Sequence, residues 1–186
     1  MRVLIVYASK HGQTRRIAEH IADVVRTCGA EPFALEVSNV PRDVVPHAAD
    51  VVIIAGPVYF GKHAKALERF VVAQRENLAR TRTAFVSVSG SARSEETRAV
   101  AEEAANAFLT LTGWRPDRVE LFAGGEPYTR YGFITRFVMK RLNQKHGRIV
   151  DVKRDYDYTD WNAVSHFARQ MVAKDVGVRE QELALP

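Results

Sequence analysis

The chain has a single cysteine, Cys28, among its 186 residues, so it cannot form an internal disulfide. Such cysteine usage is typical of proteins in a reducing compartment. No apolar run approaches the ~20 residues that a membrane-spanning helix needs. A strand pattern begins at Arg2, which leaves no room for an amino-terminal signal peptide. We therefore expect a cytoplasmic protein.

Two further classes of site lack their usual sequence patterns. No G-x-G-x-x-G turn follows a predicted strand, so there is no fingerprint for a nicotinamide dinucleotide. The six histidines do not occur at the spacings of metal ligands, and we expect no metal site. His11 and His63 fall in predicted loops, where contact with a ligand and simple exposure to solvent both remain open.

Acidic residues are outnumbered by basic ones, which gives a formal net charge of +5 and a sequence pI near 9.5. This charge favours an anionic partner, which could be a nucleic acid, a lipid surface or an acidic small molecule. The sign of the charge does not choose among them. Nucleic-acid binding would explain the charge but not the loops described below, so we do not expect it.

Hydrophobic periodicity predicts an alternation of strands and helices in one domain, residues 1–186. Continuous apolar runs predict buried strands, and apolar residues at helical spacing predict amphipathic helices. The strands are expected at 2–8, 33–37, 51–55, 84–89 and 119–123. The helices are expected at 13–27, 63–79, 95–111 and 160–174, with Ser94 and either Thr159 or Asp160 as caps. This alternation predicts an α/β fold with a doubly wound parallel sheet.

One segment interrupts the alternation. About 35 residues, 124–158, separate the fifth strand from the last helix, whereas such connections usually have ~2 to 6 residues. Insertions of this length in a compact domain are usually functional.

The loop after the first strand has the composition of an anion site. It opens a helix, whose first N–H groups and partial positive charge can hold a phosphate. Gly12 permits a close backbone approach, while Ser9 and Thr14 add hydroxyl groups. The loop fits neither nucleotide fingerprint, and on its own it could equally be an ordinary helix cap.

Two more loops are expected at the same edge of the sheet. The turn after the third strand, G-P-V-Y-F-G, carries Tyr59 and Phe60 at its tip, where a role in the core is not expected. Aromatic rings beside an anion site can cover a flat heteroaromatic ligand. The loop after the fourth strand, 87–93, is small and polar and could bond the edge of such a ligand. Together the three loops predict a site for a planar phosphate ester.

These motifs resemble those of flavodoxin-type FMN proteins. The resemblance rests on S-K-H-G-Q-T after the first strand and on D-V-V-I-I-A-G-P-V-Y-F-G-K-H around the third. It implies the strand order 2-1-3-4-5 and FMN as the cofactor. It also implies a set of cofactor-binding residues in the three loops. They are Ser9, Lys10, His11, Gly12, Gln13 and Thr14 at the phosphate, Pro57, Val58, Tyr59, Phe60 and Gly61 beside the isoalloxazine, and Ser87, Val88, Ser89, Gly90, Ser91, Ala92 and Arg93 at its pyrimidine side.

Other motifs resemble one branch of this family, the quinone-dependent protoporphyrinogen IX dehydrogenases. They are W-R-P-D-R at 114–118, A-G-G-E-P-Y-T-R-Y at 123–131 and Y-T-D-W-N at 158–162. The resemblance implies oxidation of protoporphyrinogen IX to protoporphyrin IX, with electrons passed to a membrane quinone, in heme biosynthesis. The alternative is a flavodoxin-like electron-transfer protein that serves another redox protein. No catalytic residue is assigned beyond the cofactor, and a homo-oligomer remains open.

The inserted segment also predicts a surface interaction. Apolar residues from Phe133 to Leu142 recur near helical spacing, and basic residues take the other positions. Such a helix could lie peripherally on an anionic membrane, where quinones reside, or receive the carboxylates of a porphyrinogen. The alternative is an apolar stripe packed on the domain, with solvated charges.

Overall fold

The computed structural model describes residues 1–41, 46–126, 141, 151 and 154–173. Five strands form a parallel sheet in the order β2-β1-β3-β4-β5. Their bounds are Arg2–Tyr7 for β1, Glu31–Glu36 for β2, Val51–Pro57 for β3, Arg82–Ser89 for β4 and Arg118–Ala123 for β5. The flavodoxin-like strand order is therefore confirmed.

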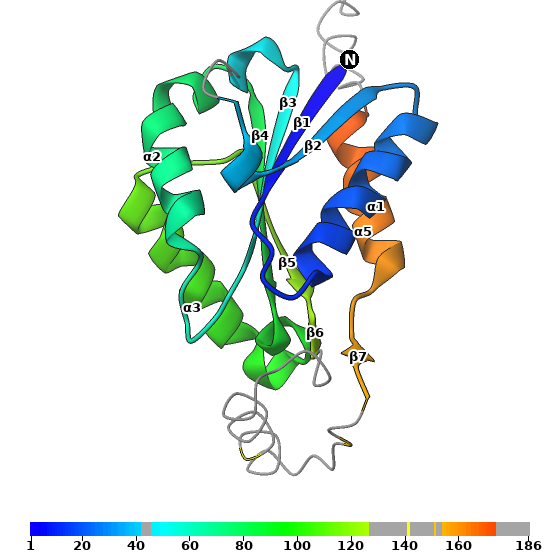
Figure 1. Ribbon diagram of the computed structural model, residues 1–186, viewed down its shortest axis with the longest axis vertical. Helices are drawn as coiled ribbons and strands as arrows, with labels where there is room; N and C mark the ends of the chain where they lie inside the picture. The colour runs from blue at the N-terminus through cyan, green and yellow to red at the C-terminus, as the bar shows by residue number, and fades with distance from the viewer. Residues whose placement is uncertain (42–45, 127–140, 142–150, 152–153, 174–186) are drawn as a thin grey trace, which may run out of the picture.

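Helices cover both faces of the sheet (Figure 1). On one face lie α1 and α5, which are Gln13–Thr27 and Trp161–Val172. On the other lie α2 and α3, which are Lys65–Leu78 and Glu95–Thr112. Short 3-10 turns occur at Val37–Asn39, Pro46–Ala48 and Gly90–Arg93.

Side chains of each central strand alternate between two hydrophobic cores, as the two-residue period of a strand requires. In β1, Val3 and Ile5 join the core under α1 and α5, whereas Leu4 and Val6 join the core under α2 and α3. All four are buried. Burial on both faces explains why the sequence of this strand is continuously apolar.

The predicted helices are present, with small differences at their ends. Asp160 is the cap of α5, because its carboxylate accepts a bond from the Ala163 N–H at 3.0 Å. Ser94 occupies the cap position of α3, yet its hydroxyl lies 2.9 Å from the Thr97 hydroxyl and makes no capping bond. The α2 helix begins two residues later than predicted, because the chain before it forms a tight turn.

A second, two-stranded sheet was not predicted. After β5 the chain forms β6, Gly125–Glu126, which pairs antiparallel with β7, Tyr156–Asp157. The two ends of the long connection are thereby held together below the main sheet (Figure 1). The amphipathic helix expected around 133–142 falls outside the described residues except at Arg141. Among the residues described, no helix is both long and apolar enough to cross a bilayer.

Candidate functional site

The sheet places three loops at one edge. The strand order reverses between β1 and β3, and ligands in open α/β sheets bind where the strands end at such a switch point. Backbone bonds hold the loop starts in register: Ala8 N–H donates to Ala55 at 3.0 Å, and Val58 N–H donates to Val88 at 2.8 Å. The loops after β1, β3 and β4 therefore leave side by side.

The first loop, Ser9 to Thr14, is folded around an oxygen atom. The Ser9 Oγ accepts bonds from the backbone N–H groups of Gly12, at 3.2 Å, and Arg15, at 3.3 Å. Gly12 has a left-handed backbone, with φ of 94°, and no side chain caps the helix from this position. Thr14 is buried. The loop thus directs N–H donors at an oxygen acceptor and needs glycine to do so.

The charge around this loop suits an anion. The first turn of α1 contains no acidic residue, and a helix start carries a partial positive charge. Arg15 bonds Glu36 on β2 at 2.9 Å, and this bond raises the pKa of the already basic Arg15. Lys10, within this loop, has its Nζ 5.4 Å from the centre of the Tyr59 ring. The helix start without acidic residues and the nearby Lys10 therefore suit a phosphate group, while the N–H groups of Gly12 and Arg15 donate to Ser9 Oγ.

The second loop is a two-residue turn with a strained tip. Tyr59 and Lys62 exchange backbone bonds of 2.9 and 3.1 Å, and both central residues have positive φ, 50° at Phe60 and 74° at Gly61. This geometry matches a type I′ turn, which favours Asn and Gly rather than Phe. The Phe60 side chain is 86% exposed. The Phe60 ring is therefore exposed at the edge of the site, and the Phe60 backbone has a conformation that is unfavourable for this residue type.

The structure brings the first two loops into contact through Tyr59. The His11 ring meets the Tyr59 ring edge-on, with centroids 5.6 Å apart. Burial raises the pKa of the half-buried Tyr59 to about 12, so its hydroxyl stays protonated at neutral pH. Lys10 and His11, which were expected at the phosphate, thus lie against Tyr59, which was expected beside the isoalloxazine.

The predicted residues of the third loop divide into two groups. Ser87 and Val88 are buried within β4, and the Ser87 hydroxyl lies 3.3 Å from His63 Nε2. The Ser89 Oγ accepts a bond from Ala92 N–H at 3.2 Å and thereby shapes the turn Gly90–Arg93. The Arg93 guanidinium lies 4.5 Å from the centre of the Tyr158 ring. This loop therefore connects the edge of the site with the end of the inserted segment.

His63 is a core residue, which corrects the expectation of an exposed or ligand-facing loop histidine. It is 5% exposed and meets the stacked rings of Phe85 and Phe108 edge-on, with ring centroids 5.1 and 5.0 Å away. Burial lowers its pKa to about 4, an effect only partly offset by the nearby carbonyls of Pro57 and Gly56. Its Nδ1 makes no hydrogen bond with the described part of the chain. His63 therefore supports the second loop from beneath as a neutral ring.

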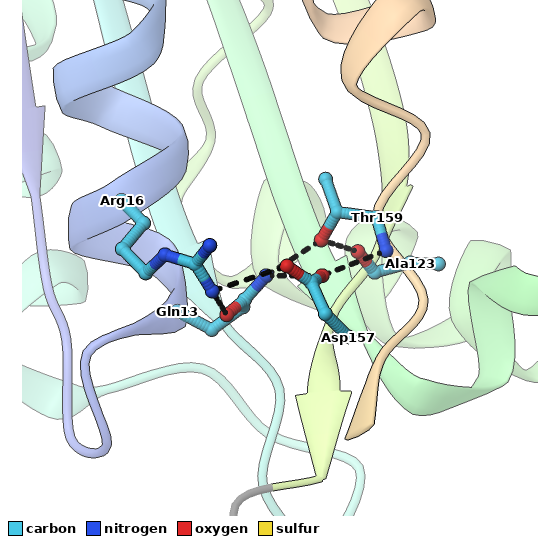
Figure 2. A network of polar contacts seen from close by, with 5 residues as sticks. All are labelled: Gln13, Arg16, Ala123, Asp157 and Thr159. Carbon is cyan, nitrogen blue, oxygen red and sulfur yellow. Dashed lines mark hydrogen bonds and ion pairs between the residues drawn. The ribbon is translucent and has the colours of Figure 1, made fainter. Parts of the chain in front are cut away.

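Sequence reasoning missed a polar junction beside the first loop (Figure 2). It joins Gln13 and Arg16, at the start of α1, with Asp157 and Thr159, after the inserted segment. The sequence separation is 141 to 146 residues. The polar residues at 157 and 159 have the spacing of one face of a strand, but this spacing does not predict a contact with α1.

Comparison with known proteins agrees with this architecture. A family model described as a flavodoxin domain matches residues 4–152. The chain belongs to the flavodoxin family. This flavodoxin-family chain is 33% identical over 174 residues to protoporphyrinogen IX dehydrogenase (quinone) of Escherichia coli K12, a match that covers 92% of the chain and 94% of that protein. The similarity places both proteins in one branch of the family.

A protein of the same name from Leishmania major is 27% identical over 183 residues, which cover 95% of the chain and 77% of that protein. Among solved structures, a short-chain flavodoxin associated with a bacterial microcompartment has a TM-score of 0.55 and 15% identity, covering 92% of the chain and 97% of its own length. The apo form of an NADH:FMN oxidoreductase has a TM-score of 0.53 and 15% identity, with 94% and 91% covered. At this identity the structural likeness concerns the fold alone.

Proposed function

We propose that the protein is an FMN-dependent protoporphyrinogen IX dehydrogenase that passes electrons to a membrane quinone in heme biosynthesis. The observation that carries the proposal is the 33% identity to an enzyme of that name over nearly the full length of both chains. Similarity restricted to the flavodoxin fold would not distinguish this activity from electron transfer.

The geometry of the three loops supports FMN as the cofactor. The N–H donors around Ser9 and the absence of acidic residues from the first helical turn suit a terminal phosphate. Tyr59 contacts this loop, Phe60 follows Tyr59 with an exposed ring, and such aromatic rings suit the flat ring system. FMN ends in a phosphate and carries such a ring, so one ligand accounts for both features.

FMN, when bound, supplies the redox chemistry by accepting electrons from the porphyrinogen and giving them to the quinone. The residues of this chain bind and orient the reactants. Burial raises the pKa of Tyr59 to about 12, so its hydroxyl stays protonated at neutral pH and can act as a hydrogen-bond donor. The pKa of the buried His63, lowered to about 4, means that this ring adds no positive charge beneath the second loop at neutral pH.

The membrane as the source of the quinone is part of the proposal. Six basic residues precede Asp151 in the inserted segment, and basic amphipathic segments bind anionic lipid surfaces. They are Arg130, Arg136, Lys140, Arg141, Lys145 and Arg148. Peripheral binding would bring the site to the quinone without a spanning helix.

The two half-reactions test the proposed function. Protoporphyrinogen IX is mixed anaerobically with the FMN-loaded protein, and the absorbance of oxidised flavin is followed. We expect it to bleach as porphyrin fluorescence appears, and to return when a quinone is added. Flavin that stays oxidised with porphyrinogen, but exchanges electrons rapidly with a redox protein, would instead favour the electron-transfer alternative.

A further inference from the structure

The junction of Figure 2 joins the cofactor side of the molecule to the far end of the inserted segment. The Gln13 Nε2 donates to Asp157 Oδ1 at 2.8 Å and to Thr159 Oγ1 at 2.7 Å. The Gln13 Oε1 accepts from the Arg16 guanidinium at 3.1 Å. All the polar atoms of this side chain are therefore engaged by residues outside the Ser9–Gly12 turn.

Thr159 is the centre of the junction. It is 9% exposed, and its hydroxyl accepts from Gln13 while it donates to the Ala123 carbonyl, at the end of β5, at 2.9 Å. Its own N–H donates to Asp157 Oδ1 at 3.0 Å. One buried hydroxyl thus ties the first turn of α1 to the main sheet.

Two further features make the junction rigid. Arg16 pairs with Asp157 Oδ2 at 3.1 Å. Although burial alone would raise it, the pKa of Asp157 is held below its ordinary value by hydrogen bonds from Thr159 and by Arg16. The backbone also fits closely, because a Cβ added at Gly125 would lie 2.7 Å from the Tyr156 carbonyl and 3.3 Å from Gln13 Oε1. The amide of Gln13 therefore has little freedom to turn elsewhere.

We propose that Gln13 is a positioning residue whose side chain, held by Thr159 and Asp157, fixes the anion-binding turn, rather than a side-chain ligand of the phosphate. Gln13 is the first residue of α1, directly after Gly12, so its anchoring sets the orientation of the N–H donors that surround Ser9. Preorganised donors bind an anion more tightly because less ordering is needed on binding. The inference rests on the proposed FMN site and assigns new roles to Gln13, Asp157 and Thr159.

The decisive substitution is Thr159→Val, which removes the hydroxyl at nearly constant volume. Gln13 and Ala123 each lose a partner, so we expect the dissociation constant of FMN to rise by about tenfold, the size of effect that one lost buried hydrogen bond produces. The dissociation constant of riboflavin, which lacks the phosphate, should change less than about twofold. A general loss of structure would instead weaken the binding of FMN and of riboflavin to the same extent.

Two companion variants isolate the hydroxyl. Thr159→Ser keeps it and should retain the wild-type preference for FMN. Thr112→Val is the matched control, since Thr112 is also buried and donates to a backbone carbonyl, that of Phe108 at 2.9 Å, within α3. It should lower stability without changing the preference.

Flavin fluorescence titrations of the full chain with FMN and riboflavin provide the measurement. If Thr159→Val does not fold, Gln13→Met serves instead, because Gln13 is only half-buried. Combining both changes should cost no more than the larger of the two single effects, since both break the link between Gln13 and Thr159. The positioning role is refuted if wild-type protein binds FMN more tightly than riboflavin and Thr159→Val keeps this preference in full. It is also refuted if the effects of Thr159→Val and Gln13→Met on FMN affinity add. Equal wild-type affinities for FMN and riboflavin would reject the phosphate site itself and the positioning role with it.

Discussion

At the scale of single residues, Phe60 combines two features that folding alone does not explain. Its backbone is left-handed and its ring is almost fully exposed. Left-handed conformations cost non-glycine residues ~1 to 2 kcal/mol, and Asn tolerates them better than Phe. Residues kept in such conformations are concentrated at binding sites, in agreement with a place at the rim of the cofactor site.

Phe60→Asn should therefore stabilise the apoprotein while weakening its ligand binding. Relief of the backbone strain should raise the free energy of unfolding by about 1 kcal/mol, and loss of the ring should lower the affinity for FMN. Urea unfolding and flavin titration measure the two effects. Phe33→Asn is the control: Phe33 is 46% exposed on the extended edge strand β2, and its replacement should destabilise. A Phe60→Asn variant with a lower free energy of unfolding than the wild type would contradict the proposed backbone strain at Phe60.

His63 predicts a specific dependence of stability on pH. Its pKa falls from 6.5 to about 4 on folding, because burial opposes the charged form. The stability that this shift contributes to the folded state is therefore fully present above pH 6.5. It is lost as the pH falls toward 4, because in this range the unfolded chain binds a proton at His63 and the folded chain does not. The loss amounts to about 3 kcal/mol at most.

His63→Phe should flatten this dependence, because the neutral ring of the aromatic cluster remains while the titration is removed. Urea unfolding between pH 7.5 and 4.5 gives the slopes to compare (~3 pH units, where the linkage acts). His166→Gln, a change at an exposed histidine on α5, should keep the wild-type slope. Equal slopes for wild type and His63→Phe would show that His63 does not titrate as proposed.

At the scale of elements, the β6–β7 pair depends on a glycine. Gly125 faces Asp157 across the pair, and a side chain there would collide with the Tyr156 carbonyl. Gly125→Ala should open the pair, so that amide hydrogens at Tyr156 and Asp157 exchange at least about tenfold faster, while β1, β3 and β4 stay protected. Gly29→Ala, which strains a left-handed turn but meets no atom within 4 Å, should leave these amides unchanged. Unchanged exchange in Gly125→Ala would refute the close packing.

The sequence predicted all five strands of the main sheet and missed the two-residue strands β6 and β7, which are too short to show a period. The apolar runs of β1 and β3 and the stripe of α1 each reflect burial, so their type and order were recoverable. A two-residue strand such as β7 has no period. Gln13 was placed in the right loop, but the direction of its side chain depends on Asp157, 144 residues away. His63 was misread because a glycine-rich turn gave no sign of the aromatic cluster beneath it.

At the scale of the whole molecule, the net charge of +5 predicts attraction to anionic membranes. Binding to anionic liposomes should weaken with added salt, because the Debye length is only ~8 Å at physiological ionic strength. Serine at positions 136, 140 and 141 should reduce this binding and leave flavin in place. Serine at Arg69, Arg75 and Arg80, exposed residues on and just after α2, removes the same charge elsewhere and should have the smaller effect. Equal effects would mean that the inserted segment has no special role.

The most direct test of the proposed function is the stoichiometry of turnover. The FMN-loaded protein is incubated anaerobically with protoporphyrinogen IX and a quinone, and porphyrin and quinol are both quantified. Oxidation of protoporphyrinogen IX to protoporphyrin IX removes ~6 electrons and each quinone accepts ~2, so we expect ~3 quinols per porphyrin. Without the quinone, porphyrin should form only in the amount that the bound flavin itself can oxidise. Porphyrin formed at the uncatalysed rate, with no quinol above the background, would contradict the proposed function.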